Sequence, residues 1–443
     1  MVEPISSDLL DAVDGLWRRG HTSSNLYAVP AFVHLREVCQ RLFPSAGSNH
    51  AMNGALSQAI YALGFRWSEA SPAKLAVAAD VAATRIDRAL RQTQAHVMHL
   101  CPLDLGDDVP QLRFGPNRIR TFTAEGLDDL LDPDGLERAR GGWRFDSRRF
   151  CQFSWLVVED TVAIPSSSGS RALPEIFFDA LEDFGRIEPH KRRFPAAVEE
   201  ALFALLTVPW EKVTSYCELD WRPFHLPWVY TISDDLLARR RTPPEAGSLS
   251  WEPAIYENDD GETEEYECPS RLSLRSDAAS EAAYLDDGAW EQLQEAQRSP
   301  LFAGPILHFV IRAFASAGID ELLAQITVIE AAVGMPIDHD ARHRPRHPGN
   351  KNPGATARVA ARLSALLNDP SASERYRALF KERSDFLHGQ AMDDISSLSR
   401  LDARRLARKC VCALVGAAIT APRPANQDLF LADLLQSAWS ISA

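Results

Sequence analysis

Hydrophobic and polar residues follow different periods in successive parts of this chain. In residues 1–100, segments such as AKLAVAADVAATRIDRALRQTQAHVMHL carry apolar residues three and four positions apart, which predicts a mainly helical region. In residues 101–238, the segments QLRFG, RIRTFT and FSWLVVEDTVAI alternate or cluster β-forming residues, and helical segments such as PAAVEEALFALL are interleaved with them. This second region is therefore predicted to be an α+β module, which would suit a sensor.

The remainder of the chain divides into a polar stretch and a helical one. Residues 239–299 contain prolines and the acidic run ENDDGETEEYE, a composition typical of a linker or loop. Residues 300–443 carry helical periodicity almost throughout. The helices are predicted at 300–317, 320–333, 354–368, 372–388, 400–419 and 426–440. We therefore expect a multidomain α+β protein with a mixed α/β N-terminal region and an all-α C-terminal bundle.

Composition narrows the class of protein. The chain has 443 residues, 45% hydrophobic and 24% charged, as expected for a soluble globular protein of two or three domains. Its apolar runs are too short to cross a bilayer, and its acidic start lacks a signal sequence, so we expect a cytoplasmic protein without a membrane partner.

The net charge and the cysteine spacing argue against two further classes of protein. A net charge of −14 argues against general electrostatic binding of nucleic acid, so any RNA contact must be local. The seven cysteines have no metal-ligand spacing, which favours free buried thiols. A phosphate-binding glycine loop of the Walker or dinucleotide type is absent from the sequence, and no cofactor is expected.

The most informative segment is RYRALFKERSDFLHG, residues 375–389, which places Arg383 and His388 in the last turns of one predicted helix. Arginine binds phosphate through a planar fork of donors, and histidine exchanges a proton near neutral pH. Gly389 is a natural left-handed cap that would leave His388 at the negative end of the helix. Asp385 is expected to accept a hydrogen bond from the His388 ring. This combination suits metal-independent ribonuclease chemistry.

Together with three other positions, this segment resembles the Apea-like HEPN domains of the HEPN superfamily. The matching residues are Glu330 in LLAQITVIEAAVG, Arg362 in ATARVAARLSALL, Tyr376, and RSDFLHG itself. The resemblance covers roughly the last third of the chain. Many members carry asparagine, aspartate or histidine where Ser384 follows the arginine here, which affects how Arg383 is oriented. Glu330 is expected to be a structural partner of Arg362 or Arg383.

The resemblance implies an RNA-cutting homodimer. Five positions turn a helix by about 140°, so Arg383 and His388 do not share one narrow stripe. HEPN proteins bring two copies of this helix together, and a homodimer through residues 300–443 would supply them. Arg383 would stabilise the phosphorus centre and His388 would transfer protons during attack by the ribose 2′ hydroxyl, which gives a cyclic phosphate. The resemblance further implies a toxin or antiphage defence protein, whose N-terminal region binds a phage or cellular trigger.

Two interpretations from other classes compete with this one. In the first, the helical region is a catalytically silent HEPN module for dimerisation or partner binding. Arg383 would then pair with Asp385, Glu382 or a neighbouring helix, and His388 would only stabilise a helix end. In the second, the protein is a transcriptional or signalling regulator with a ligand-binding first domain, although no basic helix-turn-helix stands out.

The segment DHDARHRPRHPGNK, residues 338–351, is the second candidate for chemistry. Its histidines recur every four residues, but Pro336, Pro345 and Pro348 exclude a regular helix, so a metal site is not expected. The sequence leaves open whether this is a solvated loop or a basic loop that contacts RNA backbone through Arg342, Arg344, Arg346 and Lys351. The arginine-to-histidine spacing recurs at Arg342 with His347, and at Arg91 with His96 on a predicted helix, without comparable support.

Overall fold

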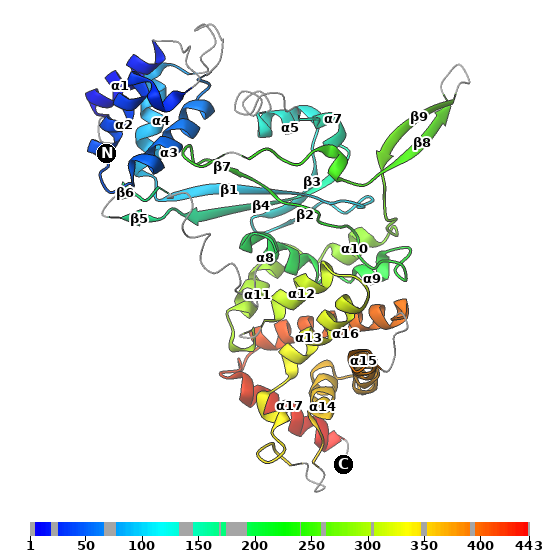
Figure 1. The fold of residues 1–443 in the computed structure, drawn as a ribbon. Coiled ribbons are helices and arrows are strands. Elements are labelled where there is room, and N and C mark those ends of the chain that lie inside the picture. The colour runs from blue at the N-terminus through cyan, green and yellow to red at the C-terminus, as the bar shows by residue number, and fades with distance from the viewer. Residues whose placement is uncertain are drawn as a thin grey trace.

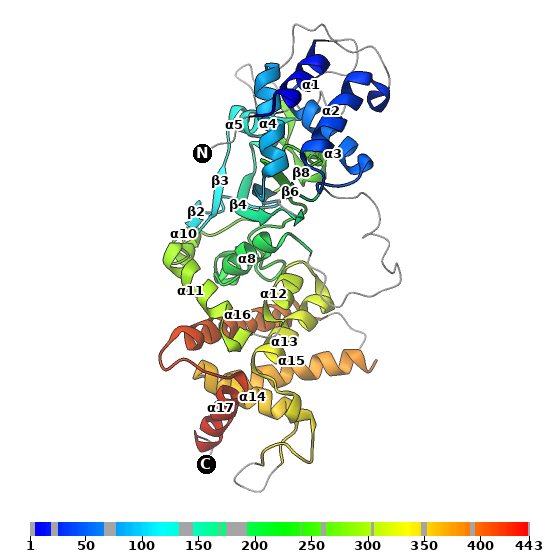
Figure 2. The same ribbon diagram turned by 90° about the vertical axis from the view of Figure 1, so that its left-hand side faces the viewer.

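The computed structural model describes residues 5–18, 25–65, 77–132, 145–167, 170–173, 193–239, 241–257, 263–302, 305–346, 352–389 and 395–441. The elements form three layers, with N-terminal helices at one end, a sheet in the middle and C-terminal helices at the other end (Figure 1). A view turned by 90° keeps this order (Figure 2). The fold is mixed α+β, with an α/β N-terminal region and a helical C-terminal region, as the sequence predicts.

The first layer is helical. It consists of α1 (Ser7–Trp17), α2 (Pro30–Leu42), α3 (Asn49–Ala62) and α4 (Ala79–Arg91), with a short 3-10 turn at Leu26–Ala28. These helices enclose their own core, in which Leu9, Phe32, Leu56 and Ile86 have no exposed surface. The apolar spacing of three and four residues places these side chains on inward faces.

The helix predicted to continue to residue 100 ends at Arg91, and Gln94–Pro102 forms strand β1. Ala95 and Val97 are buried whereas Gln94 and His96 are exposed, a two-residue period that fits a strand. The helical prediction is wrong here because the strong periodicity of α4 dominates the window that contains both segments.

The middle layer is an antiparallel five-stranded sheet in the order β2-β3-β4-β1-β7. The remaining strands are β2 (Leu112–Phe114), β3 (Asn117–Thr121), β4 (Ser154–Ala163) and β7 (Tyr230–Ser233). A separate pair joins β5 (Ser166–Ser167) to β6 (Ser170–Arg171).

Alternate side chains of β4 belong to two different cores. Trp155 and Val157 pack in the core that includes α5 (Ala124–Leu131) and α7 (Ser147–Phe150). Leu156 and Val158 pack in the core that includes α8 (Ala196–Leu205). The sheet is therefore covered on both faces, and its α8 face is turned toward the C-terminal helices (Figure 1).

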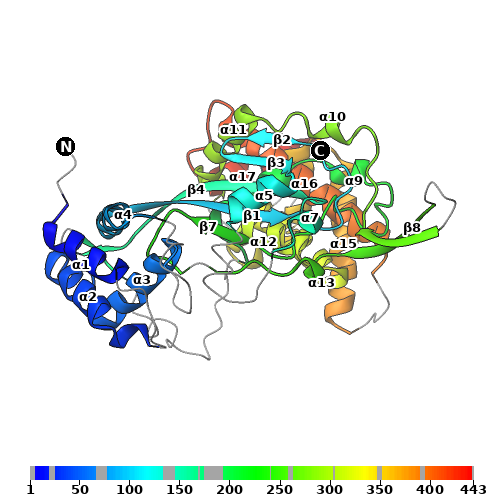
Figure 3. The ribbon, with the colours of Figure 1, turned by 90° about the horizontal axis from the view of Figure 1, so that it is seen from above.

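The segment 239–299 differs from the expected linker. It contains a 3-10 turn (Ala246–Ser248), the hairpin β8 (Trp251–Glu257) with β9 (Thr263–Pro269), α10 (Ala278–Ala282) and α11 (Asp287–Gln297). The hairpin projects away from the body of the molecule (Figures 1 and 3). Its composition resembles that of a loop because most of its side chains, including Ile255 and Tyr256, are exposed.

Five of the C-terminal helices closely follow the predicted ranges, whereas the helix predicted at 300–317 is shorter, at 306–314. The C-terminal helices are α12 (Ile306–Phe314), α13 (Gly318–Val333), α14 (Ala355–Leu367), α15 (Ser371–Leu387), α16 (Ser397–Ile419) and α17 (Gln427–Ile441), preceded by a 3-10 turn at Pro300–Phe302. Their core is continuous with the α8 face of the sheet, because both belong to one cluster of buried side chains. Across the described ranges, none of the helices combines the length and apolarity needed to span a membrane.

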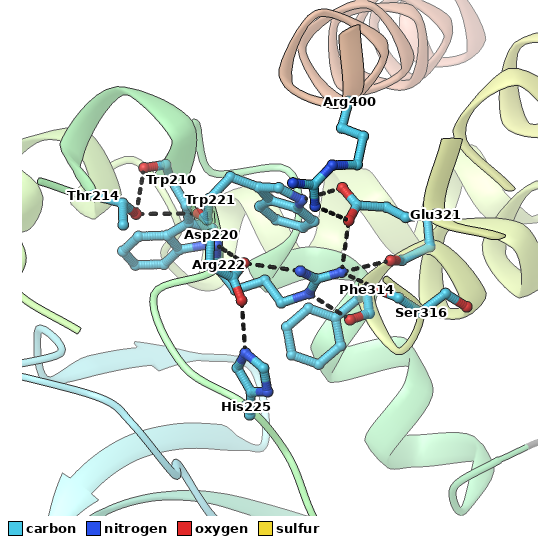
Figure 4. Close-up of polar contacts among 11 residues, drawn as sticks. Trp210, Thr214, Asp220, Trp221, Arg222, His225, Phe314, Ser316, Glu321 and Arg400 are labelled. Carbon is cyan, nitrogen blue, oxygen red and sulfur yellow. Dashed lines mark hydrogen bonds and ion pairs between the residues drawn. The ribbon is translucent and has the colours of Figure 1, made fainter. Parts of the chain in front are cut away.

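A buried polar cluster joins the sheet layer to α12 and α13 (Figure 4). Arg222, in the segment after α9 (Trp210–Val213), donates hydrogen bonds to the carbonyl oxygens of Phe314 at 2.7 Å and Ala313 at 3.1 Å. It also pairs with Glu321 on α13 at 3.2 Å. Trp221 donates its indole N–H to the same carboxylate at 2.6 Å. Because Glu321 has no exposed surface, these bonds fix the start of α13 against the sheet layer.

Candidate functional site

Helix α15 presents the segment singled out by the sequence. It ends at Leu387, and His388 is its C-cap. Gly389 has φ of +68°, the left-handed conformation predicted for it, and its amide donates to the carbonyl oxygen of Phe386 at 3.0 Å. His388 therefore lies at the carbonyl end of the helix, where a positive charge is favoured.

Glu330 on α13 holds Arg383. The Arg383 guanidinium donates to Glu330 Oε1 at 2.9 Å, and these side chains are 26% and 30% exposed. Of the two partners expected for Glu330, Arg383 is the one it binds. Arg362 instead forms a buried ion pair with Asp338, donating from Nη2 to Oδ1 at 3.0 Å. The sequence pattern did not indicate Asp338 as the partner of Arg362.

Tyr376 extends the contact around Glu330. Its hydroxyl donates to Glu330 Oε1 at 3.4 Å, and its side chain is completely buried. Burial raises the pKa of Tyr376, and the nearby Glu330 charge acts in the same direction. The phenol therefore remains protonated at neutral pH and acts as a hydrogen-bond donor to the carboxylate that also orients Arg383.

A pocket of about 440 Å³ opens beside this group. Helices α13, α14 and α15 and the 3-10 turn Pro336–His339 supply its walls, which include Glu330, His339, Thr356, Tyr376, Phe380 and Arg383. The Arg383 guanidinium also lies over the Phe380 ring at 5.3 Å from its centroid. The pocket thus combines aromatic surface with an arginine whose guanidinium fits phosphate, although the Glu330 carboxylate already accepts one of its donors.

His388 does not line this pocket, and its side chain is exposed. The expected hydrogen bond from the His388 ring to the Asp385 carboxylate is not formed. Asp385 pairs instead with Lys381 one turn earlier on α15. Four residues separate Lys381 from Asp385, which places them on one face of the helix, whereas His388 follows the last helical residue. Ser384 is half-buried, and its carbonyl oxygen accepts the His388 amide at 3.0 Å.

The loop after α13 uses one of its arginines internally. Arg344 donates to Asn352 Oδ1 at 2.6 Å and to the carbonyl oxygen of Asp338 at 3.2 Å. Arg342 and Arg346 are exposed, whereas Lys351 and His347 lie outside the described residues. The described part of the loop is therefore a structured turn with two accessible arginines.

The histidines of this loop do not converge on one site, and neither do Arg91 and His96, which repeat the spacing of Arg383 and His388. His343 contacts Asp340 at 2.6 Å, whereas His339 lines the pocket. In the part of the chain that the structure describes, no three histidine, cysteine, aspartate or glutamate side chains gather as metal ligands would. Arg91 ends α4 and pairs with Asp87 at 2.9 Å, whereas His96 lies on β1, so these two are on different elements.

Three comparisons of this chain with known proteins found no match. The chain matches no family model, no curated protein and no solved structure.

Proposed function

We propose that this protein is a metal-independent endoribonuclease of the HEPN type, with a composite site formed by two copies of α15. The observation that carries the proposal is the arrangement around Arg383. Glu330 orients its guanidinium at 2.9 Å on the wall of a pocket, and His388 ends the same helix with an exposed ring. These are the groups that the resemblance to Apea-like HEPN domains implies.

The chemistry follows from the two side chains. RNA cleavage by the 2′ hydroxyl requires a base for that hydroxyl, an acid for the departing 5′ oxygen, and positive charge on the phosphorus centre. A neutral His388 of one copy would accept the 2′ proton, and a protonated His388 of the other would donate to the leaving oxygen. Arg383 would bind the non-bridging oxygens, because guanidinium donors match their geometry. The 2′ hydroxyl requirement makes RNA the substrate.

A second copy is needed because one copy separates the two groups. Arg383 lines the pocket and His388 does not. Directly before His388, the apolar side chain of Leu387 is 55% exposed. An isologous dimer that covers Leu387 would bring two His388 side chains toward one another. Ser384, Asp385 and Tyr376 would support the arginine and the helix rather than react.

The resemblance also extends to a biological role by analogy. We propose that cleavage belongs to a toxin or antiphage defence system, in which the N-terminal layers bind a phage or cellular trigger. The buried cluster around Arg222 supports a coupling of the layers, because it ties the sheet module to α13, the helix that carries Glu330.

The proposal is tested by incubating purified protein with RNA in the presence of a chelator. Arg383→Ala and His388→Ala should each lose at least 100-fold in cleavage rate, because each removes a group required in the transition state. Arg377→Ala is the matched control, since Arg377 is an exposed arginine on the same helix, and it should cut within about twofold of the parent. Equal cleavage by all four proteins would refute the site assignment, and no cleavage by any would favour the silent module.

A further inference from the structure

A second pocket lies where α16 packs against α11, next to α9 and α10. Its volume is about 370 Å³, and its walls include Thr207, Tyr284, Leu293, Arg408, Cys412 and Val415. It shares no lining residue with the pocket beside Arg383. Arg408, Cys412 and Val415 recur at helical spacing, so one face of α16 forms a wall.

Arg408 lines the pocket, and the buried groups Glu211 and Arg404 lie behind it, so positive charge exceeds negative charge beneath this wall. Glu211 has a completely buried side chain and accepts a hydrogen bond from Arg408 Nε at 2.8 Å. Arg404 Nε lies 3.6 Å from the other oxygen of the same carboxylate. The arginine side chains are only 3% exposed at Arg404 and 11% at Arg408. Two buried guanidinium groups therefore share one carboxylate, which leaves one positive charge without a counter-ion.

The other charged and polar groups around the pocket do not remove this excess. Glu281 lines the pocket, but its carboxylate pairs with Lys212 at 3.5 Å. Arg404 donates to the carbonyl oxygen of Leu206 at 2.6 Å, a neutral acceptor. Burial lowers the pKa of Arg404 to about 10, although the negative charge of Glu211 acts to raise it. An anion at the wall would offset the cost of burying this charge.

The remaining walls suit an apolar body. Pro209, Ala289, Leu293 and Val415 supply aliphatic surface. The Tyr284 hydroxyl contacts Thr207 Oγ1 at 2.9 Å. Burial raises the pKa of Tyr284 to about 12, so its hydroxyl keeps its proton at neutral pH. An apolar pocket with a few convergent polar groups is the usual form of a small-molecule site.

We propose that this pocket binds a small organic anion, with its carboxylate or phosphate on Arg408 and its apolar body against Leu293 and Val415. The ligand would rest on α16, which also carries Arg400, 3.7 Å from Glu321 on α13. Such a ligand would thus contact the helix that anchors α13. The inference does not depend on the proposed ribonuclease activity.

The experiment is a calorimetric titration of the full-length protein with 1-naphthoate, 1-naphthyl phosphate and the neutral 1-naphthalenemethanol. One or both anions should bind at one site per chain, at least tenfold more tightly than the alcohol. The tighter anion identifies the charged group that the site takes. Equal affinity for the alcohol, or no binding by either anion, would overturn the proposal.

Two variants on α11 locate the binding. Gln292 lines the pocket and Glu291 does not, and both are exposed, so a tryptophan at either position leaves the core intact. Gln292→Trp should weaken anion binding at least tenfold by filling the pocket, whereas Glu291→Trp should remain within about twofold of the parent. Arg408→Met should abolish the preference for anions over the alcohol. Unchanged binding in Gln292→Trp would place the ligand elsewhere and refute the site.

Discussion

At the scale of single residues, two arginines of the C-terminal helices lie in different surroundings, and of the two it is Arg383 that lines the pocket beside α15. Arg362 and Asp338 are each 1% exposed in their side chains, so their ion pair is structural. Arg383 and Glu330 retain about a quarter of their side-chain surface or more, at 26% and 30%. A partly exposed pair can exchange its partner for a ligand anion at a lower cost than a buried one can. Arg383 is therefore the arginine available for phosphate.

The buried pair leads to a stability prediction. Asp338→Ala should lower the free energy of unfolding by roughly 3–5 kcal/mol, because Arg362 would be left as a buried charge without its carboxylate. Urea unfolding followed by circular dichroism measures this loss. Asp340→Ala in the same loop is the control: Asp340 is exposed and bonds only His343 and the loop backbone, so it should cost far less than Asp338→Ala. A loss below about 1 kcal/mol in Asp338→Ala would mean that Arg362 finds another partner.

At the scale of elements, the end of α15 sets where His388 lies. The chain leaves the helix through Gly389 at φ of +68°, a conformation that costs other L residues roughly 1 kcal/mol or more. A Cβ at Gly389 would meet no atom within 4 Å, so strain in the backbone, rather than a clash, is what favours glycine there.

A pair of glycine substitutions separates backbone strain from helix propensity. Gly389→Ala should destabilise the protein by roughly 1 kcal/mol because alanine resists the left-handed region. Gly416→Ala, in the last turn of α16 with no atom within 4 Å of the added Cβ, should instead stabilise it by up to about 1 kcal/mol. Thermal unfolding of both variants measures the two signs. The interpretation fails if Gly389→Ala also raises the melting temperature.

The elements that could be predicted from the sequence are those with a long, uninterrupted period. Helices α13 to α17 follow their expected ranges because each repeats apolar residues every three or four positions. Strand β1 was missed since it follows α4 after two residues. The hairpin β8–β9 and helix α11 were missed because little of their surface is buried, and in α11 only Leu293 and Ala296 are.

For the candidate site, the sequence could supply residue types but not every partner. Arg383, His388 and Gly389 fall where their spacing predicts. The partner of Arg362 could not be predicted, because Asp338 lies in a short 3-10 turn after α13, on a different element from Arg362, and spacing along the chain does not show which elements meet. Spacing alone paired Asp385 with His388. In the structure, Lys381 lies on the same face of α15 as Asp385 and is its partner.

At the scale of the whole molecule, the junction between the layers makes stability depend on acid pH. Asp220 pairs with Arg222 at 2.8 Å and with His225 at 2.8 Å (Figure 4). Burial alone would raise the pKa of Asp220, but the His225 hydrogen bond and the Arg222 charge lower it from 3.8 to about 2. The unfolded chain therefore binds a proton to Asp220 at higher pH than the folded protein does.

The lowered pKa of Asp220 fixes the direction in which the free energy of unfolding changes with pH. A lowered pKa stabilises the fold above pH 4, and this contribution, roughly 2 kcal/mol, disappears as the pH falls from about 4 to about 2. Asp220→Asn should accordingly be less stable than the parent at pH 6, with the difference shrinking toward pH 2.5. Denaturant unfolding at several pH values measures it. A difference that stays constant with pH would show that the proton on Asp220 is not linked to folding.

The proposed composite site also requires two whole chains to associate. Light scattering should give twice the chain mass of 49.1 kDa. Leu387→Arg should shift the protein to monomers, because it places a charge in the apolar surface that the partner would cover, and RNA cleavage should fall with the loss of dimer. Leu219→Arg is the matched control, because Leu219 is 77% exposed in the segment after α9, far along the chain from α15. This variant should remain dimeric and active.

A parent protein that is monomeric yet cuts RNA, or a Leu387→Arg variant that stays dimeric, would contradict an interface at the end of α15. Monomers of Leu387→Arg with an unchanged melting temperature would show that the lost activity reflects assembly rather than folding.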